Sequence, residues 1–231
     1  MRVLIACECS GIVRDAFRAS GNDAWSCDLK PSERPGNHIC GDVRGVLGDG
    51  WDLMIAHPEC TYLTISAEWA YTDGPYHMKL KPTTLVGAAR RAAREDALAF
   101  VRLLLDCSIP RVAIENPVGV IGSRIRKADQ TIQPYQFGED ASKATCLWLR
   151  NLPPLRPTRY VDPRIVNGKP RWANQTDGGQ NKLSPSPTRS ADRARTYEGI
   201  AKAMAEQWGS AVQAGHQFSL FDTPKVAAYA S

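Results

Sequence analysis

The chain has 231 residues, of which 43% are hydrophobic and 23% charged, and its formal net charge is +5. This length suits one α/β domain with at most a small appendage, and the composition excludes collagen-like, coiled-coil and wholly disordered chains. No apolar run approaches the ~18 residues of a membrane span. The N-terminus also lacks the apolar segment of a signal peptide, so we expect a cytoplasmic protein without membrane contact.

The seven cysteines are an odd number and form no CxxC pair. This pattern argues against a disulfide framework and offers no zinc-ligand spacing.

The positive charge is concentrated in one stretch. Residues 150–195 contain ten Lys or Arg against three Asp, a local charge of +7 that leaves −2 for the rest of the chain. The stretch is also rich in Pro, Gly and Ser, and a surface of this kind suits a polyanion such as nucleic acid. A solvated basic loop has the same composition, and charge alone leaves both interpretations open.

Strand-like and helix-like segments alternate along the chain. Apolar runs predict strands at 2–7, 24–27, 38–40, 52–56 and 111–115, with weaker signals at 131–137 and 145–149. Helices are expected at 11–20, 85–107 and 191–208, and Arg90, Arg91 and Arg94 are expected on a basic face of the second. The alternation predicts an α/β fold with a mostly parallel sheet.

Polar residues follow these strands where the active site of a parallel sheet lies. They are Glu8, Cys9, Ser10, Asp28, Asp42, His57, Glu59, Cys60, Glu115 and Asn116. Acidic groups at successive strand ends can bind the ribose hydroxyls and the exocyclic amine of a nucleoside, although each alone fits a helix cap equally well. The first turn lacks GxGxxG, and the chain has no GxxxxGK[ST] loop, so a ligand without phosphates, such as S-adenosylmethionine, fits better than a dinucleotide.

Six segments together resemble the DNA cytosine-5 methyltransferases, in particular their small phage-type members. They are LIACECSGIVRDAF (4–17), Asp28, GDV (41–43), DLMIAHPEC (52–60), ENP (115–117) and TYEGIAKAMAEQWG (196–209), with SKATCLWL (142–149) in place of a QxRxR strand. The resemblance implies a Rossmann-like S-adenosylmethionine-dependent methyltransferase fold, mostly parallel, with helices on both faces and a minimal target-recognition region. It also implies a bacterial or phage-infected host cell.

The resemblance assigns roles to individual residues. It implies that Cys60 adds to C6 of the target cytosine and that Glu115 contacts the flipped base, so that C5 can accept a methyl group. It implies cofactor contacts for Glu8, Ser10, Gly11, Asp28, Asp42, Val43 and Gly199. DNA contacts are expected for Lys143, Thr145, Arg156, Arg159 and Arg164.

Several residues depart from the family pattern. Glu59 replaces the Pro that precedes the nucleophile, and a carboxylate beside a thiol should raise the pKa of the thiol. Lys143 and Thr145 replace arginines. His57 stands where the family often has a small residue, and it can act as a base or cation near Cys60 or as a residue that positions the backbone.

The segment after the nucleophile, residues 61–84, is rich in aromatic and basic side chains. It contains Tyr62, Trp69, Tyr71, Tyr76, His77, Lys79 and Lys81. Such a loop either closes over a flipped base or packs on the surface of the domain, and the sequence leaves both open.

Four regions are expected: a catalytic and cofactor-binding core (1–149), a short basic target-recognition region (150–190), a closing helix (191–209) and a flexible tail (210–231). The tail contains QFSLF at 217–221, which resembles the short peptide with which bacterial replication and repair proteins dock on the sliding clamp. That resemblance implies partner contacts for Gln217, Leu220 and Phe221. The alternative is that these apolar side chains fold back onto the domain.

The function predicted from the sequence is therefore methyl transfer from S-adenosylmethionine to C5 of cytosine in DNA, by a monomer. Two alternatives remain: a related pyrimidine-modifying enzyme with another electrophile or substrate, and a catalytically inactive DNA-binding homologue. Transfer to N4 or N6 amino groups is disfavoured because no DPPY-type loop is present.

Overall fold

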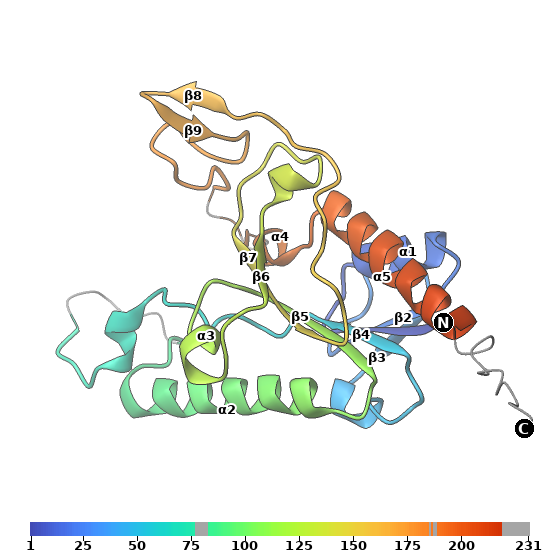
Figure 1. The fold of residues 1–231 in the computed structure, drawn as a ribbon. Coiled ribbons are helices and arrows are strands. Elements are labelled where there is room, and N and C mark those ends of the chain that lie inside the picture. Colours follow the sequence, from blue (N-terminus) through green and yellow to red (C-terminus); the bar gives the residue numbers. More distant parts are fainter. Residues whose placement is uncertain (77–82, 185, 187–188, 219–231) are drawn as a thin grey trace, which may run out of the picture.

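The computed structural model describes residues 1–76, 83–184, 186 and 189–218. Its centre is a sheet with the strand order β3-β2-β1-β4-β5-β7-β6 (Figure 1). The strands are β1 (Arg2–Ala6), β2 (Asp23–Asp28), β3 (His38–Cys40), β4 (Leu53–Ala56), β5 (Arg111–Pro117), β6 (Gln130–Ile132) and β7 (Thr145–Arg150). The first five run parallel, and β7 lies antiparallel between β5 and β6. This order, with its single reversed strand, is the Rossmann-like fold of S-adenosylmethionine-dependent methyltransferases, as predicted.

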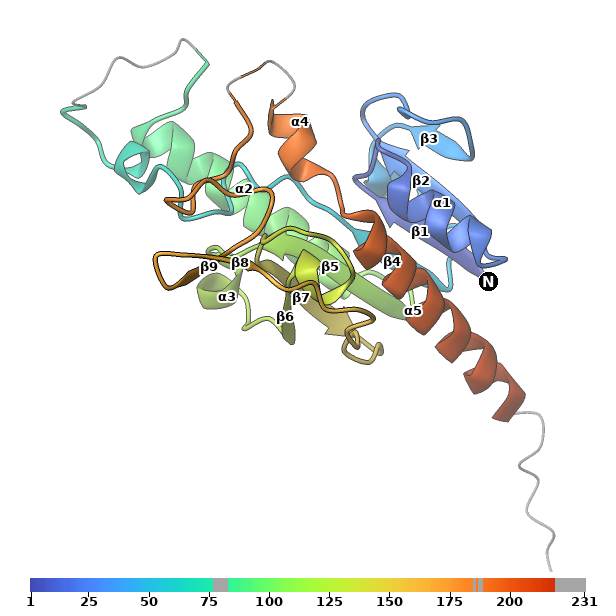
Figure 2. The same ribbon diagram turned by 90° about the horizontal axis from the view of Figure 1, so that it is seen from above.

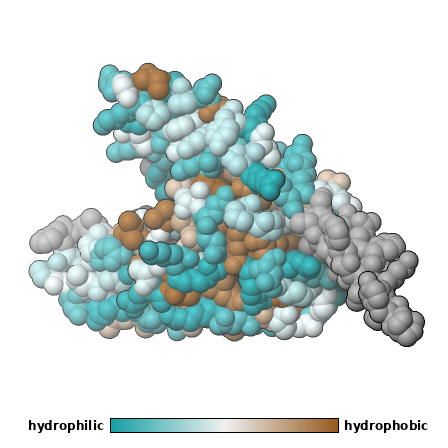
Figure 3. Space-filling model, viewed as in Figure 1, coloured by the Kyte–Doolittle hydropathy of each residue, from teal (hydrophilic) through white to brown (hydrophobic). Residues whose placement is uncertain are grey.

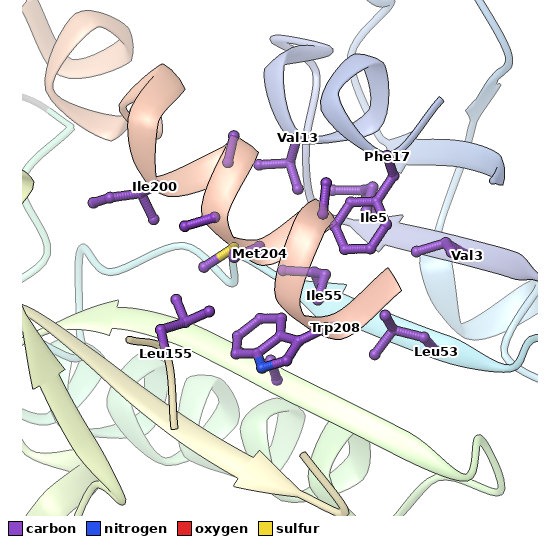
Figure 4. Close-up of a cluster of buried hydrophobic side chains, with 14 of the residues drawn as sticks. Val3, Ile5, Val13, Phe17, Leu53, Ile55, Leu155, Ile200, Met204 and Trp208 are labelled. Carbon is purple, nitrogen blue, oxygen red and sulfur yellow. The ribbon is translucent and has the colours of Figure 1, made fainter. Parts of the chain in front are cut away.

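Helices cover both faces of the sheet (Figure 2). On one face, α1 (Ile12–Ala19) packs beside α5 (Glu198–Phe218), and on the other lie α2 (Gly87–Asp106) and the short α3 (Ile121–Arg124). The side chains of β1 alternate between the two layers. Val3 and Ile5 face α1 and α5, where Phe17 and Trp208 are completely buried (Figure 4), whereas Leu4 faces α2.

A buried arginine fixes the connection between β2 and β3. Arg14 of α1 is 0% exposed, and its guanidinium donates to the hydroxyls of Ser26 and Ser32 and to two backbone carbonyls of the 29–37 segment. Gly36 lies so close that a Cβ there would be 2.8 Å from the guanidinium carbon. The segment that follows Asp28 is therefore tied directly to the first helix.

The ends of two predicted elements differ from expectation. Strand β5 continues through Pro117, past the predicted end at Glu115, because β7 pairs with it antiparallel as far as Thr145. The strand predicted at 131–137 ends at Ile132, where a 3-10 turn at Pro134–Gln136 takes over.

The prediction of one closing helix at 191–209 is wrong. Two helices are present, α4 (Arg189–Ala194) and α5, and α5 continues through Gly209 to Phe218. Gly209 is not a helix end. A Cβ at that position would lie 3.0 Å from the Asn22 side-chain amide, so the glycine permits a close approach within the helix.

The basic region projects away from the sheet (Figure 1). It contains a hairpin of β8 (Arg164–Val166) and β9 (Lys169–Arg171), and it is largely hydrophilic on the face seen in Figure 3. Stacking of Tyr135 on Trp172, with ring centroids 4.3 Å apart, holds this region to the segment after β6. None of the helices within the described residues has the length and apolarity needed to cross a membrane.

Candidate active site

The first strand end is organised around Glu8. This buried carboxylate accepts hydrogen bonds from the Ser10 hydroxyl (3.0 Å) and from the backbone N–H groups of Val13 (2.8 Å) and Arg14 (3.3 Å). Glu8 therefore occupies the N-terminal end of α1, the position at which dinucleotide-binding folds hold a pyrophosphate. Gly11 precedes the helix with a φ of 73°, a conformation that favours glycine.

Asp28 and Asp42 lie at the next two strand ends. Asp28 accepts a hydrogen bond from the backbone N–H of Lys30 (2.9 Å), and Asp42 accepts one from that of Arg44 (3.0 Å). The pKa of the Cys7 thiol is raised to about 12. Burial is the largest cause, the charge of Asp28 is the second, and Asp42 makes a smaller contribution. Both predicted cofactor carboxylates thus lie around the end of β1. Val43, also predicted there, is 4% exposed and belongs to the core.

Leu29 was not singled out in the sequence. Directly after Asp28, it is 76% exposed, the largest exposure among the large hydrophobic side chains of the described residues. An apolar residue next to a strand-ending carboxylate was a usable signal, because exposed apolar surface at a site suits a flat ligand ring.

Cys60 and Glu115 come together from the neighbouring parallel strands β4 and β5. Burial is the largest cause that raises the pKa of the Cys60 thiol, and the charge of Glu115 is the second. Glu59 raises it too, as predicted, but contributes least, and its carboxylate accepts a 2.6 Å hydrogen bond from Thr61.

Lys143 acts on both groups. Its ammonium lowers the pKa of Cys60 and the pKa of Glu115, which places the cation near the thiol and the carboxylate. The sequence assigned Lys143 to DNA. In the structure it also supplies the positive charge that opposes burial at this site.

Glu115 has an unusual environment for a buried carboxylate. Burial raises its pKa, but the hydrogen bond from His57 and the charges of His57 and Lys143 together outweigh burial, so the net shift is downward. His57 Nδ1 lies 2.9 Å from Glu115 Oε2. This pairing was missed in the sequence, because it depends on how β4 and β5 align.

The turn between β4 and Cys60 is held by Asn116. Its side-chain amide donates to the carbonyl of Pro58 (2.8 Å), while its own Oδ1 is buried without a partner in the described part of the chain. Just beyond, a Cβ at Gly119 would lie 2.0 Å from the Leu63 carbonyl oxygen. The segments after β4 and β5 are therefore in tight backbone contact.

The described part of the aromatic segment packs on α2. Arg94 donates to the carbonyls of Tyr62 and Thr64 and lies over the Tyr71 ring at 3.4 Å, and Arg91 pairs with Asp73. Arg90, predicted on the basic face of this helix, is 7% exposed and lies over the rings of Tyr62 and Tyr71.

The predicted DNA contacts are distributed unevenly. Thr145 is 3% exposed and donates its hydroxyl to the Lys143 carbonyl, so it shapes the backbone. Arg159 donates to the Gly138 carbonyl, and Arg164 pairs with Asp177 at 2.5 Å. Arg156 is the third arginine predicted to contact DNA. Unlike those of Arg159 and Arg164, its guanidinium has no partner within the described residues.

Two clefts lie next to the basic region. The first, about 490 Å³, is lined by Ile12, Glu139, Arg195, Tyr197 and Glu198, among others. Gly199 lies beside the second, of about 370 Å³, and a Cβ at Gly199 would be 2.0 Å from the Phe137 carbonyl oxygen. Neither cleft reaches Asp28, Asp42 or Cys60. Gln217 belongs to the last turn of α5, whereas Leu220, Phe221, His77, Lys79 and Lys81 lie outside the described residues.

No protein-family model and no curated protein matches the chain. Two similar solved structures are an E. coli prophage protein assigned as a DNA modification methyltransferase and a mutant of DNMT2 from Spodoptera frugiperda. The prophage protein is 10% identical, with a TM-score of 0.39, and the match covers 80% of this chain and 62% of the prophage protein. The DNMT2 mutant is 15% identical, with a TM-score of 0.37, and the match covers 74% of this chain and 57% of DNMT2. The chain thus spans less than two thirds of either, and the assignment of its fold rests on its own strand order.

Proposed function

We propose that the chain transfers a methyl group from S-adenosylmethionine to C5 of cytosine in DNA, with Cys60 as the nucleophile and Glu115 in contact with the base. One observation carries this proposal. The thiol of Cys60 and the carboxylate of Glu115 come from the adjacent parallel strands β4 and β5; the charge of Glu115 raises the pKa of Cys60, and Lys143 lowers the pKa of both groups. A nucleophile, an acid and a cation in one place are the groups that covalent catalysis on a pyrimidine requires.

The neighbouring strand ends fit S-adenosylmethionine better than a dinucleotide. Glu8 already accepts the free N–H groups of α1, so a pyrophosphate would meet a carboxylate there. Asp28 and Asp42 would hold the hydroxyls and the amine of the nucleoside, and Leu29 would cover an apolar ring. When bound, S-adenosylmethionine supplies an electrophilic methyl group.

The protein groups then divide the chemistry between them. Cytosine C5 is too weak a nucleophile by itself, so the Cys60 thiolate adds to C6 and the ring becomes an enamine. Glu115, ionised in the free protein, first takes up a proton from solvent; it then gives this proton to N3 and accepts a hydrogen bond from the 4-amino group. After transfer, the N3 proton returns to Glu115, solvent water takes the C5 proton, and the bond between Cys60 and C6 breaks, which restores the aromatic ring and regenerates the thiolate. Because the target atom lies inside the duplex, the base has to be flipped out.

One observation favours the alternative of an inactive DNA-binding homologue. Burial, Glu115 and Glu59 all raise the pKa of Cys60 and oppose formation of the thiolate, whereas Lys143 and a backbone hydrogen bond favour it. The net effect is a raised pKa of Cys60, which favours the thiol over the reactive thiolate.

Trapping on duplex DNA that contains 5-fluorocytosine tests the proposal. A covalent adduct that requires both Cys60 and S-adenosylmethionine supports cytosine-5 methyl transfer, and mass analysis of the nucleosides identifies the transferred group. A product other than 5-methylcytosine indicates a related pyrimidine-modifying enzyme. Retained DNA binding without any adduct indicates the inactive homologue and contradicts the proposal.

A further inference from the structure

His57 is the first residue after β4 and is fixed at both ends. Its backbone N–H donates to the Ala6 carbonyl (2.9 Å), and its Nδ1 lies 2.9 Å from Glu115 Oε2. Because an ionised carboxylate only accepts hydrogen bonds, Nδ1 carries the proton. The side chains of His57 and Glu115 are 11% and 9% exposed, so this hydrogen bond is shielded from water.

The two oxygens of Glu115 differ in their surroundings. Oε2 accepts the bond from His57, while Oε1 has no hydrogen-bond partner in the described part of the chain. The fully buried polar atoms without a partner in the described residues include His57 Nε2 but not Glu115 Oε1, so Oε1 is accessible to solvent. Oε1 is therefore the oxygen that reaches the solvent, and Oε2 is the oxygen fixed by His57.

We propose that His57 is a positioning residue. Its hydrogen bond holds Oε2 of Glu115, so that Oε1 of the same carboxylate faces the base. The role of Glu115 towards the base rests on the function proposed above, whereas its positioning by His57 is a property of the folded chain alone.

The same hydrogen bond controls the charge of Glu115. Burial is the largest influence on its pKa and acts upward; His57 and, to a smaller extent, Lys143 act downward. The other titratable group near the carboxylate is the Cys60 thiol, on which Glu115 and Glu59 act. Without His57, burial outweighs Lys143, and the pKa of Glu115 should rise above its ordinary value of 4.5.

Two substitutions separate positioning from simple packing. His57→Leu keeps much of the side-chain volume but removes both ring nitrogens. His57→Asn places an amide N–H near the position of Nδ1 and leaves nothing at Nε2. Thermal unfolding of both variants reports whether the fold is kept, so that any loss of structure is measured separately.

The first measurement does not depend on activity. NMR titration of ¹³C-labelled glutamate carboxyls should find the pKa of Glu115 below 4.5 in the wild type and above 4.5 in His57→Leu, with His57→Asn between the two because it keeps the hydrogen bond and loses the charge. An unchanged pKa of Glu115 in His57→Leu would overturn the inference.

The second measurement is the rate of trapping on 5-fluorocytosine DNA. We expect His57→Leu to be slower by on the order of 100-fold, since a displaced catalytic group commonly costs this much, and His57→Asn to recover most of the rate. Equal rates for wild type and His57→Leu would overturn the inference. If the wild type forms no adduct but the pKa of Glu115 shifts as expected, cytosine-5 transfer is refuted while the positioning by His57 stands.

Discussion

At the ends of β1, β2 and β3, three carboxylates accept hydrogen bonds from nearby backbone N–H groups, whereas the ends of β4 and β5 keep polar atoms without partners. Glu8, Asp28 and Asp42 belong to the first group. In the second, His57 Nε2 and Asn116 Oδ1 are buried and unpartnered within the described residues. Because buried polar atoms are nearly always satisfied, each such exception needs an explanation. The carboxylates of the first group are thus fixed by the backbone, whereas the second group keeps unused hydrogen-bonding capacity beside Cys60 and Glu115.

The largest effect on activity should come from substitutions that follow β4 and β5. Cys60→Ser should abolish methyl transfer while cofactor affinity stays nearly unchanged, because the proposed cofactor contacts lie on other strand ends. Incorporation of tritiated methyl into DNA measures the first, and calorimetry measures the second. Cys107→Ser, at the far end of α2, is the matched control and should remain active. Full turnover by Cys60→Ser would contradict the assignment of the nucleophile.

Substitutions at the ends of β2 and β3 should instead weaken the binding of S-adenosylmethionine. Asp28→Ala and Asp42→Ala should each cost roughly 1–3 kcal/mol of S-adenosylmethionine affinity, the loss expected for a buried hydrogen bond to a ligand. Asp49→Ala, an exposed carboxylate in the next loop, should bind as the wild type does. Calorimetry that shows unchanged affinity in both variants would mean that the cofactor, if any, binds elsewhere.

The coupling between Glu115 and Cys60 can be tested through thiol reactivity. Glu115→Gln removes a negative charge that raises the pKa of Cys60, so this pKa should fall. Alkylation by iodoacetamide below the pKa should then accelerate, by on the order of tenfold for each pH unit of the fall. Glu59→Gln removes the weakest of the raising influences and should accelerate alkylation less. The opposite order would show that the two carboxylates have been ranked wrongly.

A smaller, distributed effect is expected from the basic region. Neutralising Arg156, Arg159 and Arg164 together should flatten the dependence of DNA affinity on salt, by roughly one unit of slope for each phosphate that is no longer neutralised. Arg156 should contribute most, because its guanidinium has no protein partner within the described residues. A control triple of exposed cations, Arg18, Arg102 and Lys127, should leave the slope unchanged. If both triples behave alike, the region does not contact the phosphates.

The smallest effect on catalysis should come from the C-terminal segment. We expect Gln217, Leu220 and Phe221 to bind a bacterial sliding clamp with modest affinity, since a short peptide relies on a few apolar anchors. In a pull-down, Leu220→Ala/Phe221→Ala should lose the clamp, whereas Val226→Ala/Tyr229→Ala should keep it. Equal retention of both variants, or no retention of the wild type, would remove this partner.

Most of the sheet could be predicted, because its central strands are short apolar runs bounded by polar residues. Leu53–Ala56 and Val112–Ile114 are buried on both faces, the pattern of a parallel strand between two helical layers. The end of α5 could not be predicted, because Gly209 is used for close packing against Asn22, which is distant in sequence.

The sequence predicted which residues lie at the strand ends of the candidate site, but not which of their side chains pair with each other. Cys60 and Glu115 follow adjacent parallel strands, so their proximity follows from topology. The bond between His57 and Glu115 depends on side-chain directions over 58 residues of separation. The burial of Arg90 likewise depends on Tyr62 and Tyr71, which a helical pattern alone does not reveal.

The buried guanidinium of Arg14 has a consequence for how the molecule opens. Its ion pair with Asp15 stays within α1, but its hydrogen bonds to Ser32 and to the Pro35 carbonyl join the helix to the segment that follows Asp28, so detaching that segment alone would leave these donors without partners. The helix and that segment should therefore detach together, as one cooperative unit in native-state hydrogen exchange. A ligand held by Asp28 would then slow amide exchange throughout α1, at residues that never touch it.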